Sequence, residues 1–172
     1  MPHNLLKIFN HLLEIGHLTE HQRIESLRRV FERDFDDTLN FRTKLIRPIK
    51  KDGQHTVDAT FRHLITRDDY DEKGKKLGRS FEMARSLRLH WIKHHLLESS
   101  PAAIEIFSFQ DRVDGRDRVR TYIYDHENKY VIILEPQKSK LDYYIITAYH
   151  LNEPGGEKQI KNKLKNRLPD IH

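Results

Sequence analysis

The sequence predicts an α+β fold in which an N-terminal helical hairpin packs with a small antiparallel β-meander and one main helix. Apolar residues at helical spacing from Phe81 to Glu98 indicate the main helix. Three later segments, Val119–Tyr124, Tyr130–Glu135 and Tyr143–Leu151, are rich in β-branched and aromatic residues and are joined by short links. Parallel pairing would need a crossover of about a dozen residues, so we expect these strands to be antiparallel neighbours.

The composition fits a folded domain with a heavily charged surface. Of the 172 residues, 37% are hydrophobic and 33% are charged. A chain of this length buries roughly 70% of its unfolded surface and needs no disulfide or metal to fold. The sequence contains no cysteine, which excludes a disulfide framework, a thiolate zinc site and a cysteine nucleophile. We predict a helical hairpin at 1–38, an α+β domain at 39–153 and a basic helical tail at 154–172.

Two helices are expected before residue 38. The apolar residues between Asn4 and Ile15 recur at helical spacing, and the pattern ends at Gly16. Thr19 followed by Gln22 is a capping-box pattern and predicts the start of a second helix. The apolar side of that second helix consists of Ile24, Leu27, Val30 and Phe31.

The middle of the chain alternates between strand-like and charged segments. Phe41–Ile49 has strand character, and Pro48 places its end near a sheet edge or a turn. Periodicity does not decide whether Thr56–Thr66 is a strand or a short helix. Asp68–Gly78 is highly charged and contains two glycines, so it is expected to be a solvated, mobile loop.

The remaining segments flank the main helix and the meander. Ala102–Phe109 is expected to be a helical turn or a strand, and Arg112–Arg118 is expected to be a turn. Glu157–Arg167 predicts a basic helix that only Ile160 and Leu164 would attach to the rest of the protein.

The charge of the chain favours a polyanionic partner. Lysine and arginine number 31 against 26 acidic residues, which gives a formal net charge of +5. Such a balance favours RNA, DNA or an anionic membrane surface, although many small proteins are this basic without binding any of them. No apolar window approaches the length of a membrane span, and polar residues interrupt the first apolar stretch, as they would not in a signal peptide. We therefore predict a cytoplasmic protein without membrane contact.

The helix motif His90-Trp-Ile-Lys-His-His is the first candidate for chemistry. His90 and His94 are four residues apart and lie on one helix face, which is also the spacing of two zinc ligands. A zinc site needs a third ligand, and Trp91 stands where a metalloprotease would have glutamate, so no metal is expected. Two readings stay open: proton transfer or phosphate contact, and buried imidazoles that bond to the backbone.

Two strands carry polar side chains on one predicted face. Alternation in the last strand places Thr147 and Tyr149 on the same face as Tyr143. Their hydroxyl groups would bind phosphate or a base, although β-propensity alone also explains both residue types. Arg118 and Arg120 share a face of the first meander strand, where they would stabilise a phosphate or simply be solvated.

Taken in order, the segments FRHL, RSLRLHWIKHHL, RTYIYD, YVIILEP and YYIITAYHL resemble the phage-associated barnase, EndoU, colicin and RelE-like nuclease group. Members of the group commonly have a helix with a WI-type motif, followed by a meander that ends in a TAY-type strand. The likeness covers roughly Phe41 to Leu151 and is greatest at Leu89–Leu97 and Ile145–Leu151. The group more often has Pro before the Trp, where this chain has His90. The resemblance implies a barnase-like (BECR) version of the α+β fold.

The resemblance also implies RNA cleavage without a metal or other cofactor, through attack of the 2′-hydroxyl group on the adjacent phosphate. By motif position it implies three roles: acid–base catalysis, stabilisation of the phosphate, and lining of the site where the RNA is cleaved. The residues with these roles are, in that order, His63 and His90, Arg120 and Lys93, and Thr147 and Tyr149. Further substrate contacts are expected from Arg62, Arg88, His94, Arg118, Lys161 and Lys163.

These expectations place the site between the His90–His94 helix, the Arg118–Arg120 pair and the Thr147–Tyr149 strand. The implied partners are RNA and a cognate inhibitor or antitoxin, as for a toxin or a phage-element protein; the oligomeric state stays open. The N-terminal hairpin, Asn4–Arg33, lies outside the likeness and would be a cap, a dimer contact or an inhibitor-binding surface. Two other functions stay open: a non-catalytic RNA- or DNA-binding module and a protein-interaction adaptor on the same fold.

Overall fold

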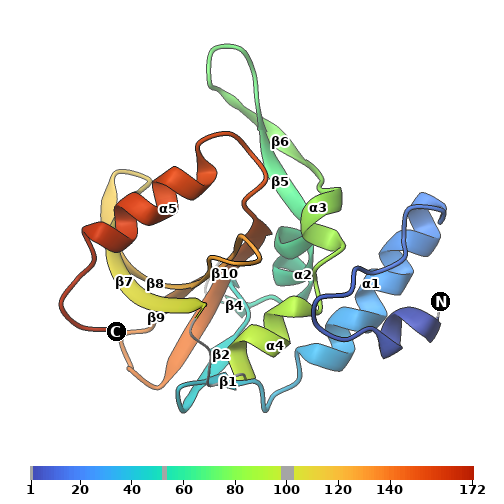
Figure 1. The fold of residues 1–172 in the computed structure, drawn as a ribbon, viewed down its shortest axis with the longest axis horizontal. Helices are drawn as coiled ribbons and strands as arrows, with labels where there is room; N and C mark the ends of the chain where they lie inside the picture. Colours follow the sequence, from blue (N-terminus) through green and yellow to red (C-terminus); the bar gives the residue numbers. More distant parts are fainter. Residues whose placement is uncertain (1, 52–53, 98–102) are drawn as a thin grey trace.

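The computed structural model describes residues 2–51, 54–97 and 103–172. Within these residues the fold is α+β and contains a six-stranded mixed sheet with helices on both faces (Figure 1). The helices are α1 (Glu20–Asp34), α2 (Val57–Ile65), α3 (Met83–Ser86), α4 (Trp91–Leu97) and α5 (Gly156–Lys165), preceded by the 3₁₀ turn η1 (Pro2–Leu6). The strands are β1 (Asn40–Phe41), β2 (Lys44–Arg47), β3 (Lys50–Lys51), β4 (Gln54–His55), β5 (Thr66–Tyr70), β6 (Lys76–Phe81), β7 (Ile104–Val113), β8 (Arg116–Asp125), β9 (Tyr130–Pro136) and β10 (Asp142–His150).

The strand order in the main sheet is β1-β2-β10-β9-β8-β7. Strands β7 to β10 form an antiparallel meander, as the short links predict. The segment that the sequence left undecided, Ala102–Phe109, contributes β7 from Ile104 onward, whereas its first residue lies outside the described residues. The expected purely antiparallel sheet is wrong, because β2 pairs with β10 in parallel. The long chain between β2 and β10 gives the parallel crossover the length it needs.

The N-terminal region contains one of the two predicted helices. Thr19 and Gln22 exchange both capping-box hydrogen bonds, and α1 begins as predicted. The first predicted helix, Asn4–Ile15, is wrong beyond the turn η1. Instead the Asn4 side chain accepts a hydrogen bond from Glu14 N and donates one to Glu14 O, which folds the segment back on itself. The segment from residue 7 to residue 18, here called the strap, therefore consists of turns and irregular chain rather than an α-helix.

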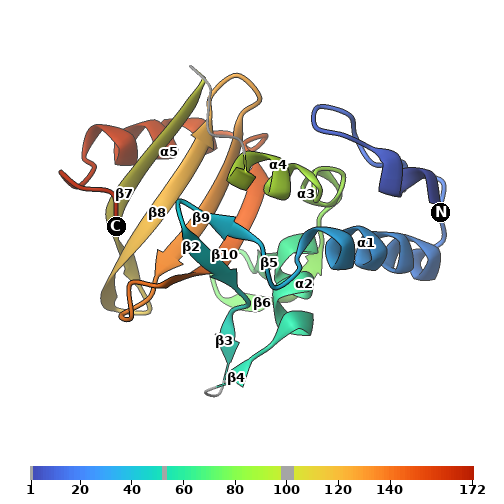
Figure 2. The ribbon, with the colours of Figure 1, turned by 90° about the horizontal axis from the view of Figure 1, so that it is seen from below.

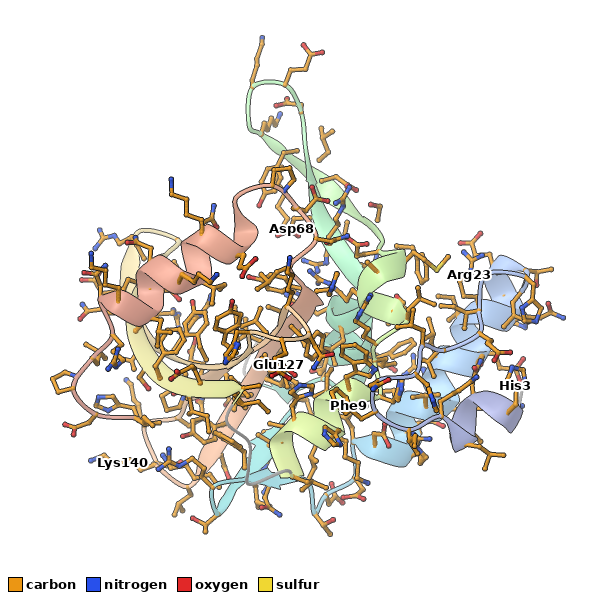
Figure 3. The ribbon with its side chains drawn as sticks, viewed as in Figure 1. His3, Phe9, Arg23, Asp68, Glu127 and Lys140 are labelled. Carbon is orange, nitrogen blue, oxygen red and sulfur yellow. The ribbon has the colours of Figure 1, made fainter. Side chains whose placement is uncertain are left out.

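The strap lies against the region of α4, where Trp91 Nε1 donates to His11 O at 3.0 Å and Leu13 N donates to Leu87 O at 3.0 Å. Figure 3 labels Phe9 of the strap close to α4. These long-range bonds satisfy strap backbone groups that a helix would satisfy locally, which explains why tertiary packing overrides the helical pattern.

The predicted charged loop, Asp68–Gly78, is instead most of a β-hairpin. Strands β5 and β6 pair from Thr66 with Phe81 to Tyr70 with Lys76, and the hairpin projects from the body of the protein (Figure 1). Across the hairpin, Asp68 accepts a hydrogen bond from Arg79 and forms an ion pair with Lys76. Opposite charges at facing strand positions stabilise such a pair, so a high charge density here favours strands rather than a loop.

The predicted main helix, Phe81–Glu98, is broken into α3 and α4, and Phe81 belongs to β6. Three successive hydrogen bonds between Arg85 and Trp91 span three residues rather than four, which tightens the chain into turns between the two helices. The predicted helix end at Glu98 lies outside the described residues. The undecided segment Thr56–Thr66 forms α2, with Phe61, Leu64 and Ile65 buried.

The two faces of the main sheet pack against different helices (Figure 2). One face carries Ile123, Ile132, Leu134 and Ile145 and packs in one hydrophobic cluster with residues of α1, α2 and α4; we call it the helix face. The other face carries Tyr122, Tyr124, Val131 and Ile133 and packs in a second cluster; we call it the groove face. Helix α5 covers part of the groove face through Ile160 and Leu164, the two residues predicted to dock it. No helix in the described part of the chain is long and apolar enough to cross a membrane.

Candidate functional site

The groove face carries a carboxylate between arginine side chains. Glu135 alternates with Val131 and Ile133 on β9 and therefore shares their face. Thr121 pairs with Leu134 across β8 and β9, so Arg120 stands beside Glu135 at the next position. Glu135 accepts a hydrogen bond from Arg118 at 2.9 Å, and Arg120 Nε lies 3.8 Å from its other oxygen. The sheet thus holds one anionic and two cationic groups in a row.

A β-bulge in β10 brings Thr147 and Tyr149 to the same face as Glu135. The pairing with β9 shifts between Ile145 and Thr147, so Ile146 is an extra residue in the strand. Before the bulge, Tyr143 and Ile145 face the helix side. Beyond it, Thr147 pairs with Ile133 and Tyr149 with Val131, both groove-face residues. The prediction that Tyr143, Thr147 and Tyr149 share one face is therefore wrong, because simple alternation does not survive an inserted residue.

Three polar atoms in this area are buried and have no hydrogen-bond partner within the described part of the chain. They are Arg120 Nε, Thr147 Oγ1 and Arg85 Nε. Buried polar groups are nearly always hydrogen-bonded, so each unpaired one calls for an explanation. Two guanidinium Nε atoms and a hydroxyl group without hydrogen-bond partners in one region fit a site that binds an additional acceptor, such as an anion.

Tyr149 lies beside Arg85, and the charges of Arg85 and Arg120 both act on its hydroxyl group. The Arg85 guanidinium carbon is 5.6 Å from the centre of the Tyr149 ring. Burial raises the pKa of Tyr149; Arg85 and Arg120 act against that rise, and Asp111 adds to it. The phenol is therefore protonated at neutral pH and can donate a hydrogen bond.

Arg85 reaches the edge of β10 because the chain before it anchors its guanidinium group. β2 pairs with β10 only as far as Tyr144, and α2 and α3 also contact β10. Arg85 donates to His63 O at 3.1 Å and to Thr66 O at 2.5 Å, at the C-terminal end of α2. Arg79 of β6 donates to the same two carbonyl groups. Carbonyl groups at a helix C-terminus favour cations, so this end of α2 holds two guanidinium groups next to the groove face.

His63 stands beside this arginine pair. Burial lowers the pKa of His63 to about 4, and repulsion from Arg79 and Arg85 contributes to the shift. The imidazole is therefore neutral at pH 7 while both arginines are charged. Arg85 thus bonds to the backbone of His63 and approaches the ring of Tyr149. The structure therefore places two predicted site residues, His63 and Tyr149, on either side of Arg85, which was not predicted.

Helix α5 closes the opposite part of the groove face through paired polar groups. Lys163 donates to Asp111 and, at 2.9 Å, to the Tyr122 hydroxyl group, which itself donates to Asp111. The predicted substrate contact at Lys163 is therefore engaged within the protein. Lys161 lies on the outer side of α5, 2.7 Å from Glu157, which raises the pKa of Lys161.

The predicted grouping of the α4 motif with the arginines of β8 is wrong. Helix α4 packs on the helix face, where Trp91, Ile92 and Leu96 join the cluster that contains Ile123. His90 Nε2 lies 3.2 Å from Ile8 O of the strap, and burial lowers the pKa of His90. His90 is thus the backbone-bonded, buried imidazole of the alternative reading.

The other basic residues predicted near that motif are also away from the groove face. His94 stacks on Phe9 of the strap with ring centres 4.0 Å apart. Lys93 is near Asp36, and its charge lowers the pKa of Asp36 after the larger effect of hydrogen bonds from Thr38. Arg88 donates to Ala84 O and lies over the Trp91 ring. Arg62 is exposed on α2.

Two important residues of the site were missed in the sequence. Glu135 ends an apolar strand in alternation with Val131 and Ile133, a pattern that does mark an acidic side chain on the inner face. Arg85 has no such signal, because its position depends on the break between α3 and α4. Among the described residues, no group of three or more His, Asp or Glu side chains is arranged to hold a metal ion.

Comparison of the chain with known protein families, with curated protein sequences and with solved structures finds no match. We therefore infer the function from the geometry of the groove face.

Proposed function

We propose that the protein is a metal-independent endoribonuclease of barnase-like (BECR) fold that acts on RNA at the groove face. The observation that carries the proposal is that Glu135, Arg120 and Thr147 share one sheet face, where Arg120 forms an ion pair with Glu135 while Arg120 Nε and Thr147 Oγ1 have no hydrogen-bond partner among the described residues. A phosphodiester oxygen accepts hydrogen bonds of the kind that these two atoms do not make within the protein, and a carboxylate beside it supplies a base.

The proposed reaction starts with proton transfer from the ribose 2′-hydroxyl group to Glu135. The 2′-oxygen then attacks the adjacent phosphorus, and the bond from phosphorus to the 5′-oxygen breaks, which leaves a 2′,3′-cyclic phosphate. Arg120 and Arg85 stabilise the charge that develops on the non-bridging oxygens. Tyr149, held as a phenol, donates its proton to the leaving 5′-oxygen. After the products leave, Glu135 releases its proton to solvent and Tyr149 regains one from solvent.

This assignment moves the base from the histidines to Glu135. His63 is neutral at pH 7 because its pKa is about 4, so it is poorly suited to donate a proton as an imidazolium ion. His90 contacts the strap on the other side of the sheet. Thr147 keeps its predicted role, in which its hydroxyl group binds a phosphate oxygen.

The test is incubation of the purified protein with single-stranded RNA in the presence of EDTA. We expect cleavage products that end in a 2′,3′-cyclic phosphate, and no cleavage where the scissile nucleotide is 2′-deoxy. Glu135→Gln and Arg120→Ala are expected to lower kcat/KM by about 10²–10⁴-fold. The matched control is Arg112→Ala, an exposed arginine that pairs with Asp117 at the far end of β7, and it should leave the rate unchanged.

Two results would decide against the proposal. RNA that stays intact but bound would favour the non-catalytic binding module, and cleavage that survives Glu135→Gln would remove the proposed base. The toxin-like role and its inhibitor partner have a separate test in expression yield. An active ribonuclease should be poorly tolerated by the host cell, and Glu135→Gln should restore growth.

A further inference from the structure

Two surface hollows meet at the loop between β9 and β10, residues 137–141, which we call the β9–β10 loop. The first has a volume of about 500 Å³ and is lined in part by Arg118, Glu135 and Tyr144, so it opens directly from the proposed site. The second has a volume of about 360 Å³ and lies on the other side of the loop. Both hollows are lined by Val119, Pro136, Gln137 and Lys138, so they adjoin.

The second hollow is lined by three lysine residues, together with Ile171 and His172 near the C-terminus. Lys44, Lys138 and Lys140 line it, and among the described residues no carboxylate lies within 4.0 Å of their ammonium groups. Lys138 and Lys140 are exposed, and Lys140 projects from the loop in Figure 3. Lys44 is half-buried, with its Nζ atom 4.8 Å from the centre of the Tyr143 ring. Three lysine ammonium groups without a carboxylate partner among the described residues thus line one hollow, next to the site proposed to bind the scissile phosphate.

We infer that Lys44, Lys138 and Lys140 bind the backbone phosphates that flank the scissile one, so that the substrate is a single-stranded oligonucleotide that passes over the β9–β10 loop. This inference rests on the proposed function, because it takes the groove face as the binding site of the scissile phosphate.

The shape of the path selects a single strand. The first hollow contains groove-face residues, whereas the second contains Lys44, which lies over a helix-face tyrosine. A ligand that fills both must turn around one short loop. Duplex DNA has a persistence length of about 150 base pairs and does not turn so sharply, whereas a single strand does. Tyr144, half-buried in the first hollow, offers its ring to an unpaired base.

The test measures binding of a 2′-O-methyl RNA of ten nucleotides, which cannot be cleaved, by fluorescence anisotropy over a range of salt concentrations. One variant, which we call the groove variant although its three residues line the second hollow rather than the groove face, combines Lys44→Gln, Lys138→Gln and Lys140→Gln. The matched control combines Lys73→Gln, Lys158→Gln and Lys165→Gln, which removes the same charge from exposed positions elsewhere. Each phosphate contact to a single strand contributes about 0.7 to the slope of log affinity against log salt, so the groove variant should lower that slope by about 2.

The expected result is a loss of affinity of at least about tenfold for the groove variant at low salt and little loss for the control. An equal loss in both variants, or none in the groove variant, overturns the inference. So does equal affinity of the unaltered protein for a duplex of the same length. Binding of this RNA needs no turnover, so it can be measured even if the protein cleaves no RNA. In that case a loss of affinity in the groove variant alone would refute the proposed function but support the phosphate contacts of the three lysines. Where RNA is cleaved, the groove variant should raise KM for the ten-nucleotide RNA and leave cleavage of a dinucleotide unchanged.

Discussion

The helix face and the groove face are built from the same strands, yet the polar side chains of those strands have different surroundings. On the helix face, Asp125 accepts hydrogen bonds from His95 Nε2 at 2.9 Å and from Asn128. Thr121 bonds to Ser108 and donates to His172 O. On the groove face, Arg120 Nε and Thr147 Oγ1 are buried without a partner among the described residues.

Under the proposed function, this difference separates strand residues that stabilise the fold, such as Asp125 and Thr121, from strand residues that bind the substrate, such as Arg120 and Thr147. A buried polar group that is hydrogen-bonded contributes to stability. If it is removed by substitution, its former partner stays buried without a hydrogen bond, which lowers the free energy of unfolding. An unsatisfied one costs stability in the free protein and recovers that cost on binding. Substitutions on the helix face should therefore affect unfolding, and equivalent substitutions on the groove face should affect activity.

The largest effect on stability is expected for Asp125→Ala. Asp125 is 3% exposed and holds His95 of α4 and the turn at Asn128 to the end of β8. Its loss leaves those two side chains without their acceptor, so the free energy of unfolding should fall by about 3 kcal/mol in urea denaturation. The control is Asp117→Ala, whose exposed pair with Arg112 is expected to contribute about 0.5 kcal/mol or less. Similar losses in the two variants would show that burial of Asp125 adds nothing.

A smaller change in the free energy of unfolding is expected when threonine is replaced by valine on each face, and this pair of variants compares the two faces directly. Thr121→Val removes a hydroxyl group that bonds to Ser108, and unfolding free energy should fall by about 1–2 kcal/mol. Thr147→Val removes one without a partner and should leave stability unchanged or raise it by up to about 1 kcal/mol. RNA cleavage should show the reverse order, with a loss of about tenfold for Thr147→Val alone. A stability loss for Thr147→Val equal to that for Thr121→Val would mean that the Thr147 hydroxyl group is already hydrogen-bonded in the free protein.

The sequence predicts elements whose stability is local or follows a simple period. The meander from β8 to β10 follows from alternation and short links, α1 from Thr19 and Gln22, and α5 from the position of Ile160 and Leu164. Each of these depends on residues close in sequence. They include the strands that carry most of the candidate site.

The elements that the sequence does not predict depend on distant contacts. The strap loses its helix because Asn4 bonds to Glu14 and because Trp91 bonds to the strap backbone. The position of Arg85 depends on carbonyl groups at the end of α2. The bulge at Ile146 shifts Thr147 to the groove face without any glycine or proline to mark it. For this reason the sequence points to the strand residues Arg120, Thr147 and Tyr149 of the candidate site, whereas it does not indicate Arg85 or the separation of α4 from these strands.

The pH dependence of stability should distinguish the border of the groove face from the helix face. The pKa of His63 is about 4 in the folded protein, lowered by burial and by Arg79 and Arg85, against about 6.5 in the unfolded chain. Between these values the unfolded state binds more protons, so His63 contributes stability that is present above pH 6.5 and is lost as pH falls towards 4. His63→Gln should flatten this part of the profile in urea denaturation, and solvent screening of a partly exposed ring keeps the effect smaller than those of Asp125 and Thr121.

The same titration can be followed by NMR with and without a bound nucleotide. A phosphate placed against Arg85 offsets the positive charge that opposes protonation of His63, so a nucleotide monophosphate should raise the pKa of His63. It should also shift the acid loss of stability to higher pH. A midpoint near 6.5 in the free protein would show that neither burial nor the arginines act on the ring. A midpoint near 4 that does not move with nucleotide would place the bound phosphate away from Arg85 and limit the site to Arg118, Arg120 and Glu135.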